Sequence, residues 1–142
     1  MTGIVVVGAG QAGATVVAML RQHGYECPLT LIGAEPHPPY QRPPLSKKYL
    51  LGELEVERLF LRPLAFYADH DIDLRLGTAV TGINRAAREV HLADDTSLPY
   101  TQVVLATGST PRRLPQSVGG ALGGVFTVRD LADVDTMTPA FQ

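Results

Sequence analysis

The sequence predicts an α/β fold in which a parallel sheet carries an antiparallel β-meander insert. Three observations support this prediction. Residues 3–33 consist of short apolar runs with one amphipathic segment between them. In residues 77–101, apolar and polar residues alternate without a helical period. A further apolar run at residues 102–106 has the length and composition of a buried parallel strand.

Length and composition fit one globular domain or part of a larger protein. The 142 residues are 45% hydrophobic and 18% charged, which argues against wholesale disorder. The net charge of −2 leaves no basic excess for a nucleic-acid partner. Residues 4–7 are too few for a membrane span or a signal peptide. The single cysteine, Cys27, fits a reducing compartment, so we expect a cytoplasmic location and a half-buried thiol.

The first βαβ unit is predicted from the start of the chain. Gly3–Val7 is a β-branched run closed by glycines, which is typical of a fully buried strand. Residues 11–23 lack proline and repeat apolar positions every three or four residues, which predicts a helix that ends at Gly24. Leu29–Ile32 is a second short strand, and we expect a right-handed, Rossmann-like crossover between the two strands.

A proline-rich loop follows the second strand. Residues 36–44 hold five prolines, which exclude a helix interior and a central strand. A short helix is expected over residues 45–51 and another from Pro63 to about His70. Residues 72–76 alternate apolar and polar side chains, which predicts a third strand.

The second half of the chain begins with the meander. Three short alternating segments, residues 79–84, 89–93 and 97–101, are separated by turn-like stretches. After the parallel strand at residues 102–106, a loop rich in proline and glycine leads to a strand over residues 125–128. A last helix is expected after Asp130.

A G-x-G-x-x-G motif stands between the first strand and the first helix. Gly8 allows the tight turn, Gly10 lets the backbone approach a pyrophosphate, and Gly13 lets the helix pack closely on the strand. The amides that open the helix, around Gln11 and Ala12, have no internal partner, and the helix dipole favours an anion there. The motif predicts a dinucleotide site, and a tight turn without a ligand is the alternative.

An acidic residue is expected near the end of the second strand, where it would bind the ribose hydroxyls. Glu35, which lies 22 residues after Gly13, is the candidate. A solvated loop carboxylate is the alternative interpretation of Glu35.

Four sequence blocks carry a resemblance to a known family. They are VVGAGQAG at residues 6–13, YQRPPLSK at 40–47, LATGSTP at 105–111 and VFTVRDL at 125–131. With the β-meander before the A-T-G run, the chain resembles the N-terminal FAD-binding part of the FAD-dependent NAD(P)H:ferredoxin/rubredoxin reductases. These are pyridine nucleotide-disulfide oxidoreductase-like enzymes that serve cytochrome P450 and dioxygenase systems.

The resemblance implies an FAD/NAD(P)-binding fold, with residues 1–142 as the N-terminal segment of the FAD-binding domain. Residues 1–76 are then the βαβ core and flavin loop, 77–101 the meander, and 102–142 the return strand and connecting segment. The NAD(P)H domain, with its nucleotide site, and a C-terminal domain are expected outside this chain.

The resemblance also implies FAD contacts position by position. Ala12 lies in the phosphate turn, and Lys47 lies beside the isoalloxazine ring. Val80 contributes a backbone contact on the adenine side, and Arg129 approaches from the VFTVR strand. Arg42 is a further expected contact, because fixed cations stabilise the phosphates and the reduced ring.

One position departs from the family pattern. The family commonly has an acid directly after the glycine that corresponds to Gly33, whereas this chain has Ala34 there, followed by Glu35. Whether Glu35 takes over the ribose contact is left open at this point. The expected cofactor-binding set is Gly8, Gly10, Gln11, Ala12, Gly13, Ala34, Glu35, Arg42, Lys47, Val80, Ala106, Thr107, Gly108 and Arg129.

The implied activity is that of an oxidoreductase that passes electrons from NAD(P)H through FAD to a ferredoxin or rubredoxin. Residues 38–51 lack the redox cysteine pair of related disulfide reductases, which favours an external acceptor such as an iron–sulfur protein. No catalytic residue is assigned, and the four histidines lack metal-ligand spacing. We expect the chain by itself to bind FAD weakly and to lack efficient turnover.

Three alternatives remain open. The first is a module that binds a nucleotide without redox chemistry. The second is a structural or interaction protein derived from such a fold. The third is part of a nitrite-reductase-type or NADH-oxidase-type flavoprotein.

Overall fold

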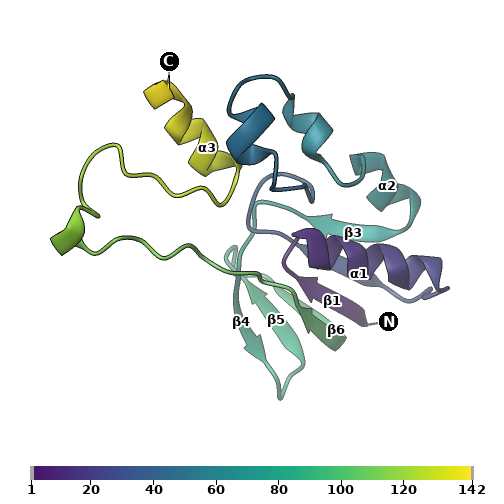
Figure 1. Cartoon of the computed structure of the whole chain (residues 1–142). Helices are drawn as coiled ribbons and strands as arrows, with labels where there is room; N and C mark the ends of the chain where they lie inside the picture. The colour runs from purple at the N-terminus through teal and green to yellow at the C-terminus, as the bar shows by residue number, and fades with distance from the viewer. Residues whose placement is uncertain (1, 142) are drawn as a thin grey trace. The chain divides into compact units, whose positions relative to one another are not determined.

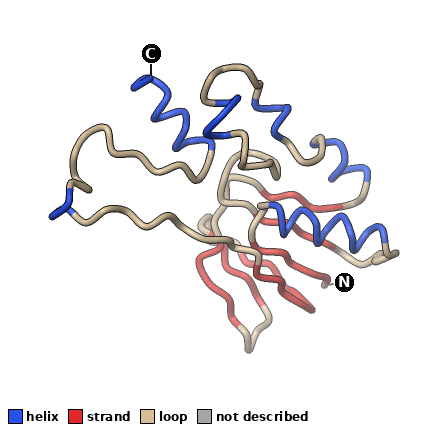
Figure 2. The backbone as a smooth tube through the Cα atoms, in the orientation of Figure 1, coloured by secondary structure: helices blue, strands red, loops and turns tan. Residues whose placement is uncertain are grey.

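The computed structural model describes residues 2–141, which divide into two compact units (Figure 1). The sheet unit comprises residues 2–40 and 60–108, and the helical unit comprises residues 41–59 and 109–141. The long connection at residues 109–128 is mostly loop, with one short helical turn (Figure 2).

The sheet unit is built on six strands in the order β3-β2-β1-β6-β5-β4. Parallel pairs join β1 to β2, β2 to β3, and β1 to β6, whereas β5 pairs antiparallel with both β4 and β6. This arrangement confirms the predicted α/β fold with a meander insert. The strands are β1 (Gly3–Val7), β2 (Leu29–Ile32), β3 (Ile72–Arg75), β4 (Val80–Asn84), β5 (Glu89–Leu92) and β6 (Ser97–Leu105).

Strand β1 is buried on both faces, because its successive side chains point to opposite sides of the sheet. Ile4 and Val6 pack in one cluster with Val17 of the first helix. Val5 and Val7 pack in a second cluster, which includes Val90 and Leu92 of β5 and Tyr100 of β6. The continuous apolar run that predicted a buried strand is therefore explained by a helix on one face and the meander on the other.

Two helices belong to the sheet unit. Helix α1 (Gln11–Gln22) follows β1, and Gly24, with φ of 80°, lies just beyond its last turn as predicted. Helix α2 (Leu64–Asp69) begins directly after Pro63, which has extended backbone. The ring of Pro63 fixes a φ that suits the start of a helix, so the predicted position is confirmed within one residue.

Arg21, in the last turn of α1, links three segments of the sheet unit. Its guanidinium donates to the backbone oxygens of Cys27 at 3.0 Å, His70 at 2.8 Å and Asp71 at 2.7 Å, and also to that of Tyr25. These bonds satisfy carbonyls that lie in turns rather than in the sheet. They fix the end of α1 against the turn between α2 and β3.

One strand replaces two predicted ones. Residues 97–101 and 102–106 were expected as separate strands, but β6 is continuous from Ser97 to Leu105. Its first part pairs antiparallel with β5, and its second part pairs parallel with β1, with a register shift opposite Gly3 and Ile4. No glycine or turn pair interrupts the run, so the chain stays extended as it passes from one partner to the other.

The helical unit contains short elements. The predicted helix at residues 45–51 is present as η1 (Leu45–Tyr49), but it is kinked at Lys47, whose backbone has φ of −130° and ψ of −112°. The other helical elements are the turns η2 (Val56–Leu59), η3 (Gln116–Val118) and η4 (Thr138–Phe141), and the helix α3 (Leu131–Met137).

Helix α3 starts where it was predicted. Asp130 occupies its N-cap, and the Asp130 carboxylate accepts a hydrogen bond from the backbone N–H of Asp133. Leu131, Val134 and Met137 are buried at 1%, 0% and 6% exposure, so one face of this short helix anchors the unit.

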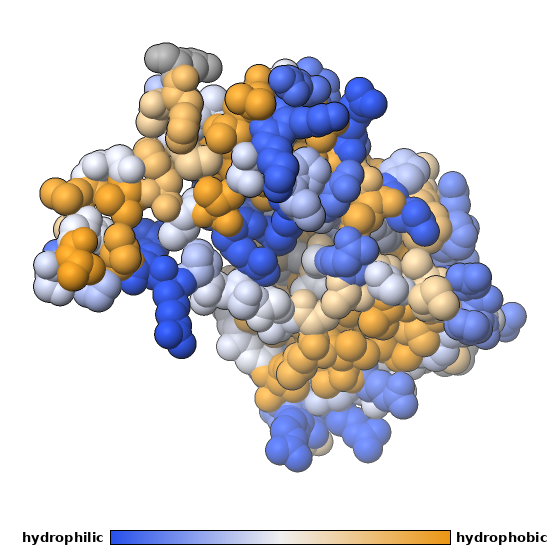
Figure 3. All heavy atoms as spheres, viewed as in Figure 1, coloured by the Kyte–Doolittle hydropathy of each residue, from blue (hydrophilic) through white to orange (hydrophobic). Residues whose placement is uncertain are grey.

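The strand predicted over residues 125–128 is absent from the described part of the chain. An extended segment becomes a strand only when a neighbour supplies hydrogen bonds, and these residues pair with none among residues 2–141. The preceding loop also leaves apolar side chains at the surface, visible as an orange group around η3 (Figure 3). The exposed apolar residues there are Leu114, Val118 and Leu122.

Cys27 is exposed, so the half-buried position expected for it is wrong: it lies in the loop after α1, where only its backbone oxygen is engaged by Arg21. Within residues 2–141, no helix has the length and apolarity that a membrane span requires.

Candidate functional site

The glycine-rich turn packs tightly against the end of β6. Gly8 has φ of 112°, and a Cβ built on it would lie 2.1 Å from the backbone oxygen of Ala106. A Cβ on Gly13 would lie 1.9 Å from the backbone oxygen of Gly8. The Gly8 N–H donates to the backbone oxygen of Ile32 at 2.8 Å, and the Ala106 N–H donates to the backbone oxygen of Val7 at 2.8 Å. The turn therefore meets the carboxyl ends of β1, β2 and β6, which is where open parallel sheets bind ligands.

Gly10 differs from its two neighbouring glycines, because a Cβ on it would meet nothing within 4 Å. It is the N-cap of α1 and provides no side-chain cap, and the first turn of this described helix holds no acidic residue. Gln11 and Ala12 are exposed. The amides at the start of α1 thus face open space without a competing carboxylate, which fits an anionic pyrophosphate.

The end of β2 carries the candidate ribose contact. A Cβ on Gly33 would lie 2.6 Å from the Cβ of Ala9, so this strand end packs directly on the glycine-rich turn. Ala34 is exposed and Glu35 is half-buried. The backbone oxygen of Glu35 accepts a hydrogen bond of 2.9 Å from Gly77, which begins the meander.

Tyr40 is a site residue that the sequence analysis missed. Its hydroxyl donates a hydrogen bond to Oε2 of Glu35, and its ring is buried at 4% exposure. A buried ring and a turn at Gly77 hold Glu35 from two sides, so this carboxylate is not a freely solvated loop charge. Tyr40 stands five residues after Glu35, in a proline-rich loop without a repeating geometry, so no sequence pattern indicates this contact.

Val80 lies in β4, at one end of the strand order. Its side chain packs half-buried on the second core cluster, and it pairs with Leu92 of β5. Strand β4 has one strand neighbour among the described residues. Its outer edge can therefore offer backbone groups to a ligand, as the expected adenine-side contact requires.

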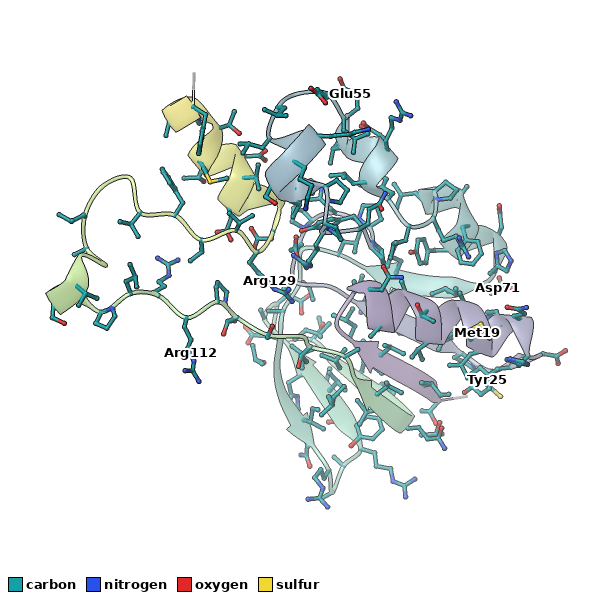
Figure 4. All side chains as sticks on the ribbon, in the orientation of Figure 1. Met19, Tyr25, Glu55, Asp71, Arg112 and Arg129 are labelled. Atoms are coloured by element: carbon teal, nitrogen blue, oxygen red, sulfur yellow. The ribbon has the colours of Figure 1, made fainter. Side chains whose placement is uncertain are left out.

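Arg42, Lys47 and Arg129 belong to the helical unit. The Arg42 Nη1 donates to the backbone oxygen of Arg129 at 2.5 Å, so the structure brings these two predicted residues together. The Lys47 ammonium group is exposed and donates to the backbone oxygen of Pro43 at 3.1 Å. Arg129 was expected on a strand, but it lies in the loop directly before α3 (Figure 4).

A groove of about 530 Å³ in the helical unit was not predicted. Across it, the Tyr49 hydroxyl donates to Oδ1 of Asp135 at 2.8 Å. Burial, together with the hydrogen bond to Asp135 and the charges of Asp135 and Glu55, raises the pKa of Tyr49 to about 12. Its phenol is therefore neutral at physiological pH and provides a hydrogen-bond donor, not a charge.

The predicted residues thus fall into two sets. The sheet unit holds the candidates for the ADP half of a dinucleotide, namely Gly8, Gly10, Gln11, Ala12, Gly13, Ala34, Glu35, Val80, Ala106, Thr107 and Gly108. The helical unit holds the cations Arg42, Lys47 and Arg129. Among residues 2–141, no cluster of three or more histidine, cysteine, aspartate or glutamate side chains is arranged to hold a metal ion.

Comparison with known proteins gives a consistent set of relatives. The family model described as pyridine nucleotide-disulphide oxidoreductase matches residues 2–141. A ferredoxin–NAD(P)+ reductase from a Sphingomonas species is 45% identical over 134 residues, which are 94% of this chain and 32% of that protein. The rubredoxin–NAD+ reductase of Pseudomonas putida is 37% identical over 134 residues, or 94% of this chain and 34% of its own length.

A solved structure extends the likeness to three dimensions. The crystal structure of a covalent putidaredoxin reductase–putidaredoxin complex matches with a TM-score of 0.89 and 40% sequence identity. The match covers 98% of this chain and 34% of that one. The chain therefore spans about a third of the length of the relatives it matches.

Proposed function

Because this chain belongs to the pyridine nucleotide-disulphide oxidoreductase family, we propose that it is the FAD-binding part of a flavoprotein reductase that passes electrons from NAD(P)H to a ferredoxin or rubredoxin. The family implies a bound flavin. We assign the NAD(P)H site to the part of the relatives' length that this chain does not span. A cytoplasmic location is part of the same proposal.

The observation that carries the proposal is the open start of α1. Space lies beside Gly10, and the first turn of α1 has neither an acidic residue nor a side-chain cap. A pyrophosphate placed there accepts hydrogen bonds from the amides of Gln11 and Ala12 and interacts favourably with the helix dipole. The close packing of Gly8 and Gly13 keeps the turn in the shape that this contact needs.

Glu35 is our candidate for the ribose contact in place of the family acid. The carboxylate accepts the Tyr40 hydroxyl through Oε2, and a carboxylate is a type of acceptor that ribose hydroxyls can bind. Tyr40 thereby acts as an orienting residue for Glu35. The edge of β4 at Val80 would meet the adenine side, and Ala106, Thr107 and Gly108 would complete the pocket at the end of β6.

The cations of the helical unit suit the flavin end of the cofactor. When bound, FAD supplies the conversion between two-electron and one-electron transfer. Lys47 and Arg129 carry fixed positive charge that stabilises negative charge on the phosphates or on the reduced ring. Arg42 contributes in the same way and also holds the backbone of Arg129.

The acceptor is proposed from the relatives. The similar proteins are named as reductases of ferredoxin, rubredoxin and putidaredoxin, and one is seen in a covalent complex with putidaredoxin. We propose a small electron-transfer protein of this kind, a ferredoxin or a rubredoxin, as the partner of the whole reductase.

The test is a titration of the purified chain with FAD, followed by flavin absorbance and by the melting temperature. With the wild-type chain, FAD binding should change the flavin absorbance and raise the melting temperature. Gly10→Ala should weaken binding about tenfold or more, because its Cβ enters the pyrophosphate space and lost hydrogen bonds to a charged group cost about 1.5–3 kcal/mol. Gly123→Ala is the matched control, since its Cβ also meets nothing within 4 Å but lies in the loop after η3.

Two outcomes contradict the proposal. One is a wild-type chain that shifts neither signal, and the other is equal FAD affinity in Gly10→Ala and the wild type. ADP that binds as tightly as FAD would favour a nucleotide-binding module without a flavin role. NADH-driven reduction of ferricyanide at the rate of a complete reductase would contradict our placement of the NAD(P)H site outside this chain.

A further inference from the structure

Arg129 is a proposed FAD contact carried by a segment without a strand partner among the described residues. Residues 125–128 belong to no helix or strand, and no ladder of backbone hydrogen bonds among residues 2–141 fixes their direction. Arg129 is nevertheless half-buried and directly precedes the N-cap of α3 (Figure 4). Other groups must therefore hold its backbone.

The side chain of Asp133 holds the N–H of this residue. Its Oδ2 accepts a hydrogen bond of 2.7 Å from the Arg129 N–H. Both carboxylate oxygens lie 3.3 Å from the Thr127 hydroxyl, which donates to them. The N–H of Asp133 in turn donates to Oδ1 of Asp130 at 2.9 Å, which is the N-cap bond of α3. One carboxylate thus joins the first turn of α3 to the segment that precedes it.

The backbone oxygen of Arg129 is held as well. It accepts the 2.5 Å hydrogen bond from Arg42. Leu131 and Val134 bury the inner face of α3, so the helix that carries Asp133 is itself anchored. The backbone N–H and C=O of Arg129 are both hydrogen-bonded, so the direction in which its side chain extends from the backbone is fixed.

We propose that Asp133 is a positioning residue for Arg129, and that its carboxylate fixes the backbone from which the guanidinium reaches bound FAD. This inference rests on the proposed function. Asp133 contacts the Arg129 amide and not the cofactor. Its contribution is pre-organisation, because a side chain that is already directed loses less freedom when the ligand binds.

A double-mutant cycle on FAD affinity in the full chain tests the proposal. Arg129→Ala should weaken FAD binding about 10- to 100-fold, the loss expected for a hydrogen bond to a charged group. Asp133→Ala should weaken it about two- to tenfold, the cost of ordering one long side chain. In the Arg129→Ala background, Asp133→Ala should change affinity less than about twofold.

Two further variants separate positioning from a general loss of structure. Asp133→Asn keeps an oxygen that can accept the Arg129 N–H, so its FAD affinity should stay within about threefold of the wild type. Asp135→Ala removes a carboxylate from the same helix that binds Tyr49 instead, and it should leave FAD affinity unchanged. An equal loss for Asp133→Ala in both backgrounds, or no loss in either, overturns the proposal.

Amide hydrogen exchange provides a readout that needs no cofactor. The Arg129 amide should exchange slowly in the wild type and in Asp135→Ala, and faster in Asp133→Ala. A chain that binds no FAD contradicts the proposed function. The exchange rate of the Arg129 amide then still tests whether Asp133 positions this residue. Fast exchange of this amide in the wild type overturns the positioning role.

Discussion

The Arg42 guanidinium donates a hydrogen bond of 2.5 Å to the backbone oxygen of Arg129, 87 residues further along the chain. Both residues were predicted as cofactor contacts, from two separate sequence blocks. The bond joins the proline-rich block to the segment before α3 within one unit. Arg42 therefore has a structural role in addition to its proposed contact with FAD.

Arg42→Ala is expected to destabilise the helical unit. Removal of a hydrogen bond to a charged group costs about 1.5–3 kcal/mol. For a chain of this size, each kcal/mol lowers Tm by about 4 °C. Thermal unfolding followed by circular dichroism measures this loss. Arg112→Ala is the control, because Arg112 extends from an exposed loop (Figure 4), and it should change stability by less than about 0.5 kcal/mol. Equal effects of the two variants would argue against a structural role for Arg42.

Gly13→Ala is expected to unfold or strongly destabilise the sheet unit. Its Cβ would lie 1.9 Å from the Gly8 oxygen and 3.1 Å from Cδ1 of Leu31, so α1 must move away from the sheet. Overpacking of this kind typically costs about 1–3 kcal/mol. Urea denaturation should show a lower midpoint for Gly13→Ala than for Gly10→Ala, whose Cβ meets open space. The reverse order would show that the turn is not packed as described.

Tyr67→Phe is expected to preserve or increase stability. The Tyr67 ring is 2% exposed in the first core cluster, and its hydroxyl has no hydrogen-bond partner among residues 2–141. Removal of an unsatisfied buried hydroxyl avoids a desolvation penalty of about 1–3 kcal/mol. Tyr67→Ala should instead cost about 3–5 kcal/mol, because it leaves a cavity. A clear loss of stability in Tyr67→Phe, measured by denaturant unfolding, would indicate that the hydroxyl has a partner.

Alkaline pH is expected to destabilise the chain through Tyr49 and Tyr67. Burial is the main cause that raises the pKa of each phenol from 10.0 to about 12, and the hydrogen bond to Asp135 adds to it for Tyr49. A raised pKa means that the folded state favours the neutral phenol. This stabilisation is complete below the unfolded pKa of about 10 and is lost as the pH rises through about 12.

The free energy of unfolding should therefore fall between about pH 10 and pH 12, as measured by urea denaturation at each pH. Tyr49→Phe and Tyr67→Phe should each make this fall shallower, because each removes one of the two titrating groups. The same slope in the wild type and both variants would exclude these tyrosines as its cause.

The local elements of the fold were predictable because their signals are local. Gly3–Val7 and Leu29–Ile32 were placed with correct bounds, since apolar runs ended by glycine mark both ends of a buried strand. Helix α1 followed from apolar spacing, and the helix expected after Asp130 is present as α3. The strand expected at residues 125–128 was wrong because extended sequence does not reveal whether a partner strand lies beside it.

Contacts between distant or irregular segments could not be predicted from the sequence. Nothing in the local pattern indicates that Arg42 binds the Arg129 backbone, because the two are 87 residues apart. The bond from Tyr40 to Glu35 depends on the path of a proline-rich loop that has no repeating geometry. The bond from the Asp133 N–H to the Asp130 carboxylate is easier to predict, since an N-cap aspartate commonly accepts the N–H of the residue three positions later.

The most direct measurement is the backbone amide NMR spectrum of the chain titrated with ADP and, separately, with adenosine. The amides of Gly10, Gln11, Ala12 and Gly13 should show the largest shifts with ADP, and adenosine should leave them almost unchanged. This result would place the two phosphates at the start of α1. ADP shifts located elsewhere, or equal shifts with adenosine, would contradict a pyrophosphate site at this turn.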